Sequence, residues 1–225
     1  MMRAQSLCFL VSILVTILHV GYSQNSWDYY VFSVTWPPTY CESIQCRLPR
    51  GLRDFTIHGL WPTIFPNRQP NCTGSLRFDI RRLQGIRNEL DLMWPHLKNY
   101  RESPSFWKHE FEKHGLCAVE DPQVFNQYGY FKFGIQLMQK LNLLKTLMKY
   151  RISPHDSRQY DTINLMNVLE REFGYNGSAN CIRKPGRRGM YHLEEVHVCL
   201  NRKHEFMNCP FLGNCPKKFI FPPFQ

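Results

Sequence analysis

FWKHEFEKHG, residues 106–115, is the stretch around which the chain is organised, because no other segment combines ionisable and aromatic residues so densely. On a helix with about 100° per residue, one face would carry four ionisable side chains: His109, Glu110, Lys113 and His114. They form two pairs at a spacing of four residues, which brings helical side chains together. Three aromatic residues, Phe106, Trp107 and Phe111, are interleaved with these charges, which is unusual for a helix face exposed only to solvent. We therefore expect a functional site here.

A zinc-binding HExxH motif is the obvious alternative interpretation of these letters. That motif places two histidines four residues apart on one helix face. His109 and His114 are five residues apart, which puts them about 140° from each other round an ideal helix. We therefore expect no zinc at this segment, and no other metal or cofactor.

The N-terminus is typical of a secreted protein. Residues 7–20 form an apolar run with few polar interruptions, preceded by Arg3. The run is too short for a membrane span and predicts a signal peptide, residues 1–23, cleaved near Ser23. The remaining chain, residues 24–225, is long enough for one well-filled core, so we expect a single extracellular domain and a monomer.

Cysteines and glycosylation sequons agree with that prediction. Of nine cysteines, Cys8 would leave with the signal peptide. The others form an even set, which predicts four disulfides in an oxidising compartment. Their spacing leaves about a hundred pairings open, although Cys41 and Cys46 are near enough to close a small loop. Asn71 and Asn176 begin N-x-[ST] sequons and are expected to be glycosylated.

The charge balance suggests an anionic partner. The chain has 28 Lys and Arg against 18 Asp and Glu, a net charge of +10 at pH 7. Loss of residues 1–23 removes only Arg3 from this count, so the mature chain stays strongly basic. Such a charge suits a nucleic acid, an anionic polysaccharide or a membrane surface. The charge alone does not distinguish these partners.

Two strands are predicted before the central stretch. Residues 27–36 (WDYYVFSVTW) are aromatic and β-branched and stop at paired prolines. Residues 55–62 (FTIHGLWP) alternate, with His58 on the face opposite Ile57, and we expect Gly59 and Pro62 to end that strand. A lone histidine on a strand is as readily structural as catalytic. Trp61, expected in the turn, is a plausible stacking surface.

The rest of the chain predicts helices and one more strand. Residues 80–97 indicate a helix broken at Pro95, and Asp121 with Pro122 the start of another. An apolar stripe runs through Leu137, Leu141, Leu144 and Met148.

A helix over 161–173 should end at Gly174, and residues 194–200 alternate like a strand. Together these elements predict an α+β fold, a single domain with a central antiparallel β-sheet packed by helices and stapled by disulfides.

FTIHGLWP followed about fifty residues later by FWKHEFEKHG resembles the two active-site segments of the ribonuclease T2 family. The resemblance implies metal-free cleavage of single-stranded RNA through a 2′,3′-cyclic phosphate. It assigns the acid and base to His58 and His114. It assigns binding of the phosphate and stabilisation of the transition state to His109, Glu110 and Lys113.

The resemblance also implies base-binding residues and a disulfide pattern. Trp61 corresponds to a tryptophan that helps to stack a base, and Phe106 is a second candidate. The implied disulfides, besides the one closing the small loop, pair Cys72 with Cys117, Cys181 with Cys215 and Cys199 with Cys209. Two departures affect base preference: Thr35 stands where the family usually has Gln, and Thr63 where it often has an acid.

Within the family, the basic charge and the length resemble the plant self-incompatibility ribonucleases, which would act on pollen-tube RNA and meet pollen F-box proteins. Retention of His109 and Glu110 is more typical of ordinary extracellular ribonucleases for defence or phosphate scavenging. A non-catalytic, cationic binding protein is the main alternative from another class, although it would not need both His58 and His114. A membrane-active protein is a third, but residues 137–151 are more simply a core helix.

Overall fold

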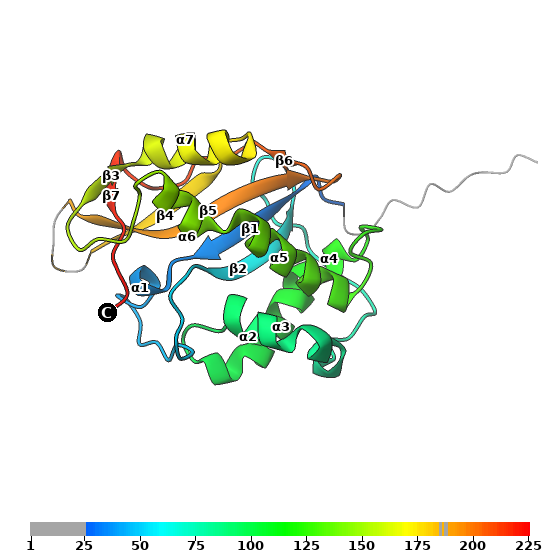
Figure 1. The fold of residues 1–225 in the computed structure, drawn as a ribbon. Helices are drawn as coiled ribbons and strands as arrows, with labels where there is room; N and C mark the ends of the chain where they lie inside the picture. The colour runs from blue at the N-terminus through cyan, green and yellow to red at the C-terminus, as the bar shows by residue number, and fades with distance from the viewer. Residues whose placement is uncertain (1–25, 185, 187–188) are drawn as a thin grey trace, which may run out of the picture.

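The computed structural model describes residues 26–184, 186 and 189–225, so the signal peptide expected at 1–23 lies outside the described residues. In this part of the chain seven strands form one sheet. They are β1 (Tyr29–Thr35), β2 (Thr56–Thr63), β3 (Gln159–Asp161), β4 (Ser178–Arg183), β5 (Tyr191–Asn201), β6 (Phe206–Met207) and β7 (Lys218–Ile220). With helices packed beside the sheet, the fold is α+β, as the sequence predicts (Figure 1).

The sheet has the order β2-β1-β5-β7-β3, and β4 and β6 also pair with β5. Its pairings are antiparallel, except that β5 and β7 meet in parallel at His192 and Ile220. β1 lies between β2 and β5, and all of its residues are buried. Its aromatic and β-branched side chains suit a strand that is covered on both faces. The strand predicted over 27–36 is therefore confirmed, although the paired prolines open a short helix, α1 (Pro37–Tyr40).

β2 is longer than the sequence pattern predicts. It passes through Gly59 and Pro62 and ends at Thr63, so the expected stop was wrong, and Trp61 lies in the strand and not in a turn. The sheet order explains why proline is tolerated, because β2 is an edge strand and an edge residue can lack a ladder hydrogen bond.

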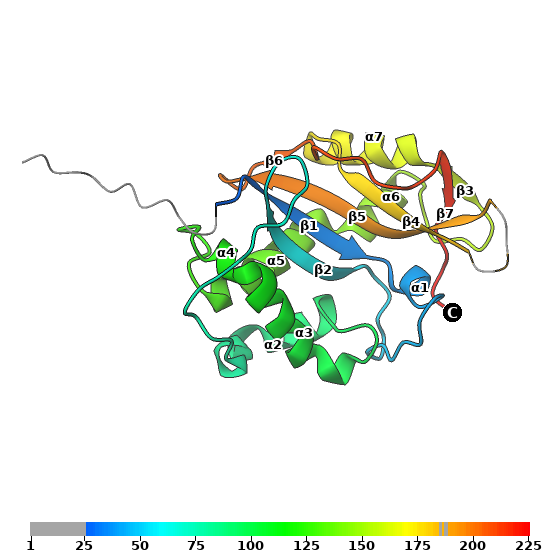
Figure 2. The ribbon, with the colours of Figure 1, turned by 180° about the vertical axis from the view of Figure 1, so that it is seen from behind.

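Most helices come from the chain between β2 and β3. These are η1 (Ile80–Ile86), α2 (Arg87–Met93), η2 (Tyr100–Glu102), α3 (Ser103–Glu110), η3 (Phe111–Gly115), α4 (Leu116–Ala118), α5 (Gln127–Leu141) and α6 (Leu143–Lys149). Opposite views place α2 and α3 beyond the β2 edge of the sheet (Figure 1 and Figure 2). α7 (Thr162–Phe173) lies at the other side, beside β4 and β6.

Two predicted helix boundaries were wrong. The helix expected over 80–97 starts as the 3₁₀ helix η1, and α2 stops at Met93. Trp94 follows, and a residue directly before a proline disfavours the helical conformation. Asp121 caps no helix, because its Oδ1 accepts the Gln123 N–H of a turn. Asn126 caps α5 instead, accepting the main-chain N–H of Gly129.

The apolar stripe that starts at Leu137 does not run along one helix. Asn142 adopts the left-handed conformation (φ 37°) and separates α5 from α6. Leu141 is buried before this break, whereas Met148 is exposed after it, so its predicted place in the core was wrong. The α7 prediction is confirmed, with Gly174 at φ 88° ending the helix as expected.

Four disulfides connect these elements: Cys41–Cys46, Cys72–Cys117, Cys181–Cys215 and Cys199–Cys209. They are the pairs that the family resemblance and the short loop imply. The second ties the irregular segment after β2 to α4, directly behind the central stretch. Across the described ranges, the helices are too short or too polar to cross a membrane.

Candidate active site

His58 occupies an irregular position in β2. In the register with β1, Ser33 pairs with Gly59 and Val34 with Ile57, so His58 is the extra residue of a β-bulge. Bulges of this kind turn a side chain away from the regular alternation and are frequent beside active sites. Trp94 fixes the main chain here, because its indole N–H donates to the carbonyl of His58 at 2.9 Å. The bulge therefore presents the imidazole from a firmly held backbone.

The central stretch changes its helical pitch half-way. α3 ends at Glu110, and residues Phe111–Gly115 form the π-helical turn η3, a feature that is frequent at functional sites. Packing explains the glycine in it, since a Cβ on Gly115 would lie 2.4 Å from the ring of Phe111. The ideal angles assumed for this stretch therefore do not apply beyond Glu110.

The four ionisable residues of that stretch do not share one face, which corrects the prediction. His109 and Lys113 are exposed, whereas Glu110 and His114 are each only 3% exposed. One pair, His109 and Lys113, is thus open to solvent, and the other, Glu110 and His114, is buried toward the sheet. Among the residues described, no group of three or more His, Cys, Asp or Glu could hold a metal ion.

Trp61 is the centre of the arrangement. Its ring centroid lies 5.0 Å from that of His58 and 5.6 Å from that of His114. Its indole N–H donates to Oε2 of Glu110 at 3.0 Å. Gly59 makes this possible, because a Cβ there would lie 2.0 Å from the indole nitrogen. The structure thus brings together residues of both sequence motifs, and the ring of Trp61 is near both histidines.

Burial and charge shift the ionisation of the groups on the α3 side. Burial lowers the pKa of His114 to about 3, and the positive charges of Lys113, His109 and His58 act in the same direction. Burial also raises the pKa of Glu110, against the opposing effects of His58 and of the Trp61 hydrogen bond. At neutral pH, His114 is therefore an uncharged imidazole.

Glu195, in β5, is a site residue that the sequence analysis missed. Its Oε1 lies 2.6 Å from Nδ1 of His58. Burial lowers the pKa of His58, but the hydrogen bond and charge of Glu195, with the charges of Glu110 and Glu194, outweigh it and raise the pKa above 6.5. The alternation of residues 194–200 could have pointed to Glu195, because it places Glu195 and His197 on one face of a strand. What the sequence could not give is the pairing that sets β5 beside β1.

Phe106 lies beside the histidines, at the edge of a small hollow. Its ring stacks on His96 with centroids 5.4 Å apart and planes 26° apart, and lies 6.4 Å from the His58 ring. Phe106, His96 and His58 line this hollow of about 130 Å³ together with Thr35 and Tyr40. A flat ring at such an opening is suited to stack on another ring.

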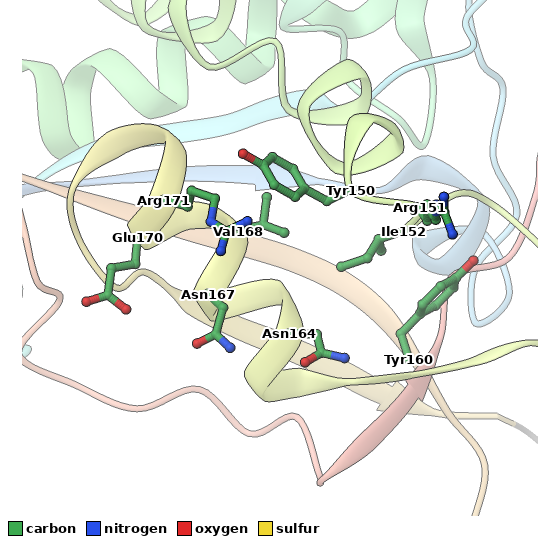
Figure 3. A pocket seen from close by; sticks show the side chains of 9 residues that line it. All are labelled: Tyr150, Arg151, Ile152, Tyr160, Asn164, Asn167, Val168, Glu170 and Arg171. Carbon is green, nitrogen blue, oxygen red and sulfur yellow. The ribbon is translucent and has the colours of Figure 1, made fainter.

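A larger hollow, of about 620 Å³, lies elsewhere, between the end of α6 and α7 (Figure 3). Tyr150, Arg151, Tyr160 and Arg171 line it with five other residues, and none of the candidate catalytic residues does. Size alone does not identify a site. His58, whose pKa is raised by nearby carboxylates, lines the smaller opening, which makes that opening the better candidate.

Comparison with known proteins decides the family. The model of the ribonuclease T2 family matches residues 27–209, a range that contains both motifs. The chain belongs to the ribonuclease T2 family. It is therefore a T2-type endoribonuclease, and RNA is its substrate class. The likeness inferred from the two motifs is confirmed at the level of the family.

Relatives cover almost the whole chain. Ribonuclease Oy from Magallana gigas is 32% identical over 208 residues, covering 88% of this chain and 98% of that protein. Extracellular ribonuclease LE from Solanum lycopersicum is 31% identical and covers 98% of both. Among solved structures, ribonuclease MC1 from bitter gourd seeds is 30% identical, with a TM-score of 0.75 over 87% of this chain and 100% of that one.

Proposed function

We propose that this chain is a secreted endoribonuclease that cleaves single-stranded RNA by transesterification through a 2′,3′-cyclic phosphate, without a metal ion and with low base specificity. The observation that carries the proposal is the pair of histidines whose rings both lie near Trp61 and whose pKa values are shifted in opposite directions. Cleavage needs one group to accept a proton and another to supply one. A neutral His114 and a charged His58 meet both needs at the same pH.

The two histidines then have distinct roles. His114 accepts the proton of the 2′-hydroxyl, and the resulting oxygen attacks phosphorus. The bond from phosphorus to the 5′-oxygen breaks, and His58 donates its proton to that leaving oxygen. The products are a 2′,3′-cyclic phosphate and a free 5′-hydroxyl, while the proton taken up by His114 balances the one lost by His58.

Charge that builds on the phosphate oxygens needs compensation. Lys113 and, when protonated, His109 are exposed cations next to His114, so both are suited to the phosphate. Glu110 has an indirect role in this proposal, because its carboxylate holds Trp61. Phe106, whose ring faces the small hollow, offers a surface on which an unpaired base can stack without strict sequence preference.

Secretion is supported by the signal-peptide pattern of residues 1–23 and by four disulfides, which persist in oxidising compartments. Asn71 is exposed and Asn176 is half-buried, so the first sequon is the more accessible glycosylation site in the folded chain. The name of one relative, extracellular ribonuclease LE, is consistent with this location.

A role in plant self-incompatibility is the narrower proposal. It rests on the high net positive charge and on chain length. The relatives named above favour the general extracellular role, since they are ribonucleases from different kinds of organism. Rejection of self pollen after the gene is silenced separates the two roles: lost rejection supports self-incompatibility, and unchanged rejection supports the general one. Binding to pollen F-box proteins belongs to the first role only.

The chemical proposal is tested with purified protein, single-stranded RNA and a chelator. The wild type should cut RNA and leave 2′,3′-cyclic phosphate ends. His58→Asn and His114→Asn should each lose about 10²- to 10⁴-fold in kcat, the usual contribution of one acid or base. Both variants should still bind RNA, because the cationic surface is unchanged. A wild type that binds RNA without cutting it would favour the non-catalytic alternative.

A further inference from the structure

The carboxylate of Glu195 lies between two histidines. Its Oε1 is 2.6 Å from His58 Nδ1 and accepts a hydrogen bond from the Thr35 hydroxyl at 3.0 Å. Its Oε2 is 3.2 Å from Nε2 of His197. The side chain of Glu195 is 14% exposed, so most of these contacts are shielded from water. Both carboxylate oxygens are therefore engaged, and the group has little freedom to rotate.

Strand pairing builds this arrangement from two neighbouring strands. Thr35 of β1 pairs directly with Glu195 of β5, and Ser33 pairs with His197. His58 belongs to β2 on the far side of β1, and from its place in the β-bulge the ring reaches across to the carboxylate. A regular β2 would leave His58 in the alternating pattern, so the bulge and the carboxylate work together.

The contact decides which nitrogen of His58 is available. An ionised carboxylate can only accept, so Nδ1 of His58 must carry the hydrogen of this contact, in the neutral and in the charged ring alike. Nε2 is then the only nitrogen left for another molecule. The His58 side chain is 40% exposed, so this nitrogen can be reached from solvent.

We propose that Glu195 is a positioning residue: it fixes the ring orientation and tautomer of His58 so that Nε2 faces the leaving 5′-oxygen, and His197 and Thr35 hold Glu195 in place. This inference rests on the proposed function, in which His58 is the acid. Glu195 itself does not touch the substrate.

If Glu195 positions His58 for catalysis, its loss should change the pKa of His58. If it only holds the strands together, its loss should leave that pKa unchanged. The charged groups that act on His58 are Glu194 and Glu195 from β5 and Glu110 from α3, and His58 in turn acts on His114 of η3. Of the three carboxylates, Glu195 alone is hydrogen-bonded to the ring in the part of the chain that the structure describes. Glu194 is a neighbour of similar charge without that bond, which makes it the natural control.

The experiment compares Glu195→Gln with Glu194→Gln in the full mature chain. Glutamine keeps the size of the side chain and an acceptor oxygen, so the fold should be retained, as checked by Tm and by binding to RNA. For Glu195→Gln we expect kcat/KM at neutral pH to fall by about 10- to 100-fold, as for the loss of a carboxylate that orients a metal-bound histidine. The alkaline limb of its pH profile should move to lower pH. Glu194→Gln should change kcat/KM by less than about 3-fold.

A second measurement does not depend on activity. NMR titration of the His58 ring should show a lower pKa in Glu195→Gln than in the wild type, and Thr35→Val, which keeps the charge, should show a smaller change in the same direction. If the wild type cuts no RNA, the proposed function fails, but the titration still tests the contact. If the wild type cuts RNA and Glu195→Gln matches it in rate, pH profile and His58 pKa, the positioning role is overturned. Should Glu195→Gln not fold, the Thr35→Val titration decides alone, and an unshifted His58 pKa overturns the inference.

Discussion

Replacing Gly59 with alanine would put a methyl group where the hydrogen bond between Trp61 and Glu110 now runs. The added Cβ would lie 2.0 Å from the indole nitrogen and 2.5 Å from Oε2 of the carboxylate. Real Cβ atoms do not approach other atoms so closely, so the indole must move. Such a movement breaks the 3.0 Å hydrogen bond and displaces a ring that lies near both His58 and His114.

The cost of Gly59→Ala has two parts. Overpacking at a tight contact costs about 1 to 3 kcal/mol. Leaving the buried Glu110 carboxyl without its donor costs about 1 to 3 kcal/mol more. A loss of about 3 kcal/mol in a chain of this size lowers Tm by about 6 to 12 °C. Because Trp61 lies near both the proposed acid and the proposed base, kcat/KM should fall as well, by about 10-fold or more.

Calorimetry and a ribonuclease assay on the same samples test this reasoning. Gly85→Ala is the matched control, since a Cβ there would meet its nearest atom, Cε2 of Tyr128, at 3.8 Å. It should change stability by less than about 0.5 kcal/mol. In a Trp61→Phe background the cost of Gly59→Ala should shrink, because the two closest indole atoms are gone. A Gly59→Ala protein with wild-type Tm and wild-type kcat/KM would refute the argument.

Four further results are expected. Replacing Cys72 and Cys117 together by serine should lower the free energy of unfolding by about 2 to 5 kcal/mol, measured by chemical denaturation; no change would mean that the bond does not constrain the loop. Phe106→Ala should weaken binding of short single-stranded RNA by about 1 to 3 kcal/mol, and equal titration curves would show that no base stacks there. Lys113→Ala should lower kcat by about 10²-fold with little change in KM, unless the lysine only binds substrate. The pH profile of kcat/KM should fall as pH rises through the raised pKa of His58 and should stay high on the acid side until pH approaches 3; a steep acid limb near 6.5 would contradict this assignment.

Sequence reasoning worked where side-chain chemistry is local. The strand around β1 and the α7 helix with its terminal Gly174 follow from residue types and spacing, whereas the two motifs were interpreted as active-site segments through the family resemblance. The family resemblance added the disulfide pairs, which spacing alone could not select.

It failed where geometry depends on partners far away in the sequence. Pro62 was expected to end a strand. β2 continues through it because β2 is an edge strand, in which proline is tolerated. Asp121 was expected to cap a helix. Its carboxylate instead accepts the main-chain N–H of Gln123 in a turn and the hydroxyl of Tyr30. The spacing of residues 106–115 did not reveal the π turn, because that spacing was interpreted with ideal α-helical angles throughout.

Glu195 illustrates the same limit inside the site. It lies 137 residues from His58 in sequence, and only the order of the strands brings the two together. Its residue type and its face of the strand can be predicted from the alternation of residues 194–200, but its neighbour cannot. The candidate catalytic residues His58 and His114 belong to the two dense motifs, whereas Glu195 stands outside both.

The most direct test of the central claim is cleavage of a DNA oligonucleotide that contains one ribonucleotide. Attack by a 2′-hydroxyl, with His114 as base and His58 as acid, predicts a single cut directly 3′ of that nucleotide. The cut should leave a 2′,3′-cyclic phosphate, should persist in chelator, and should be lost in His114→Asn. Cuts at deoxynucleotides, a 5′-phosphate end, or a His114→Asn protein that cleaves at the wild-type rate would contradict the account.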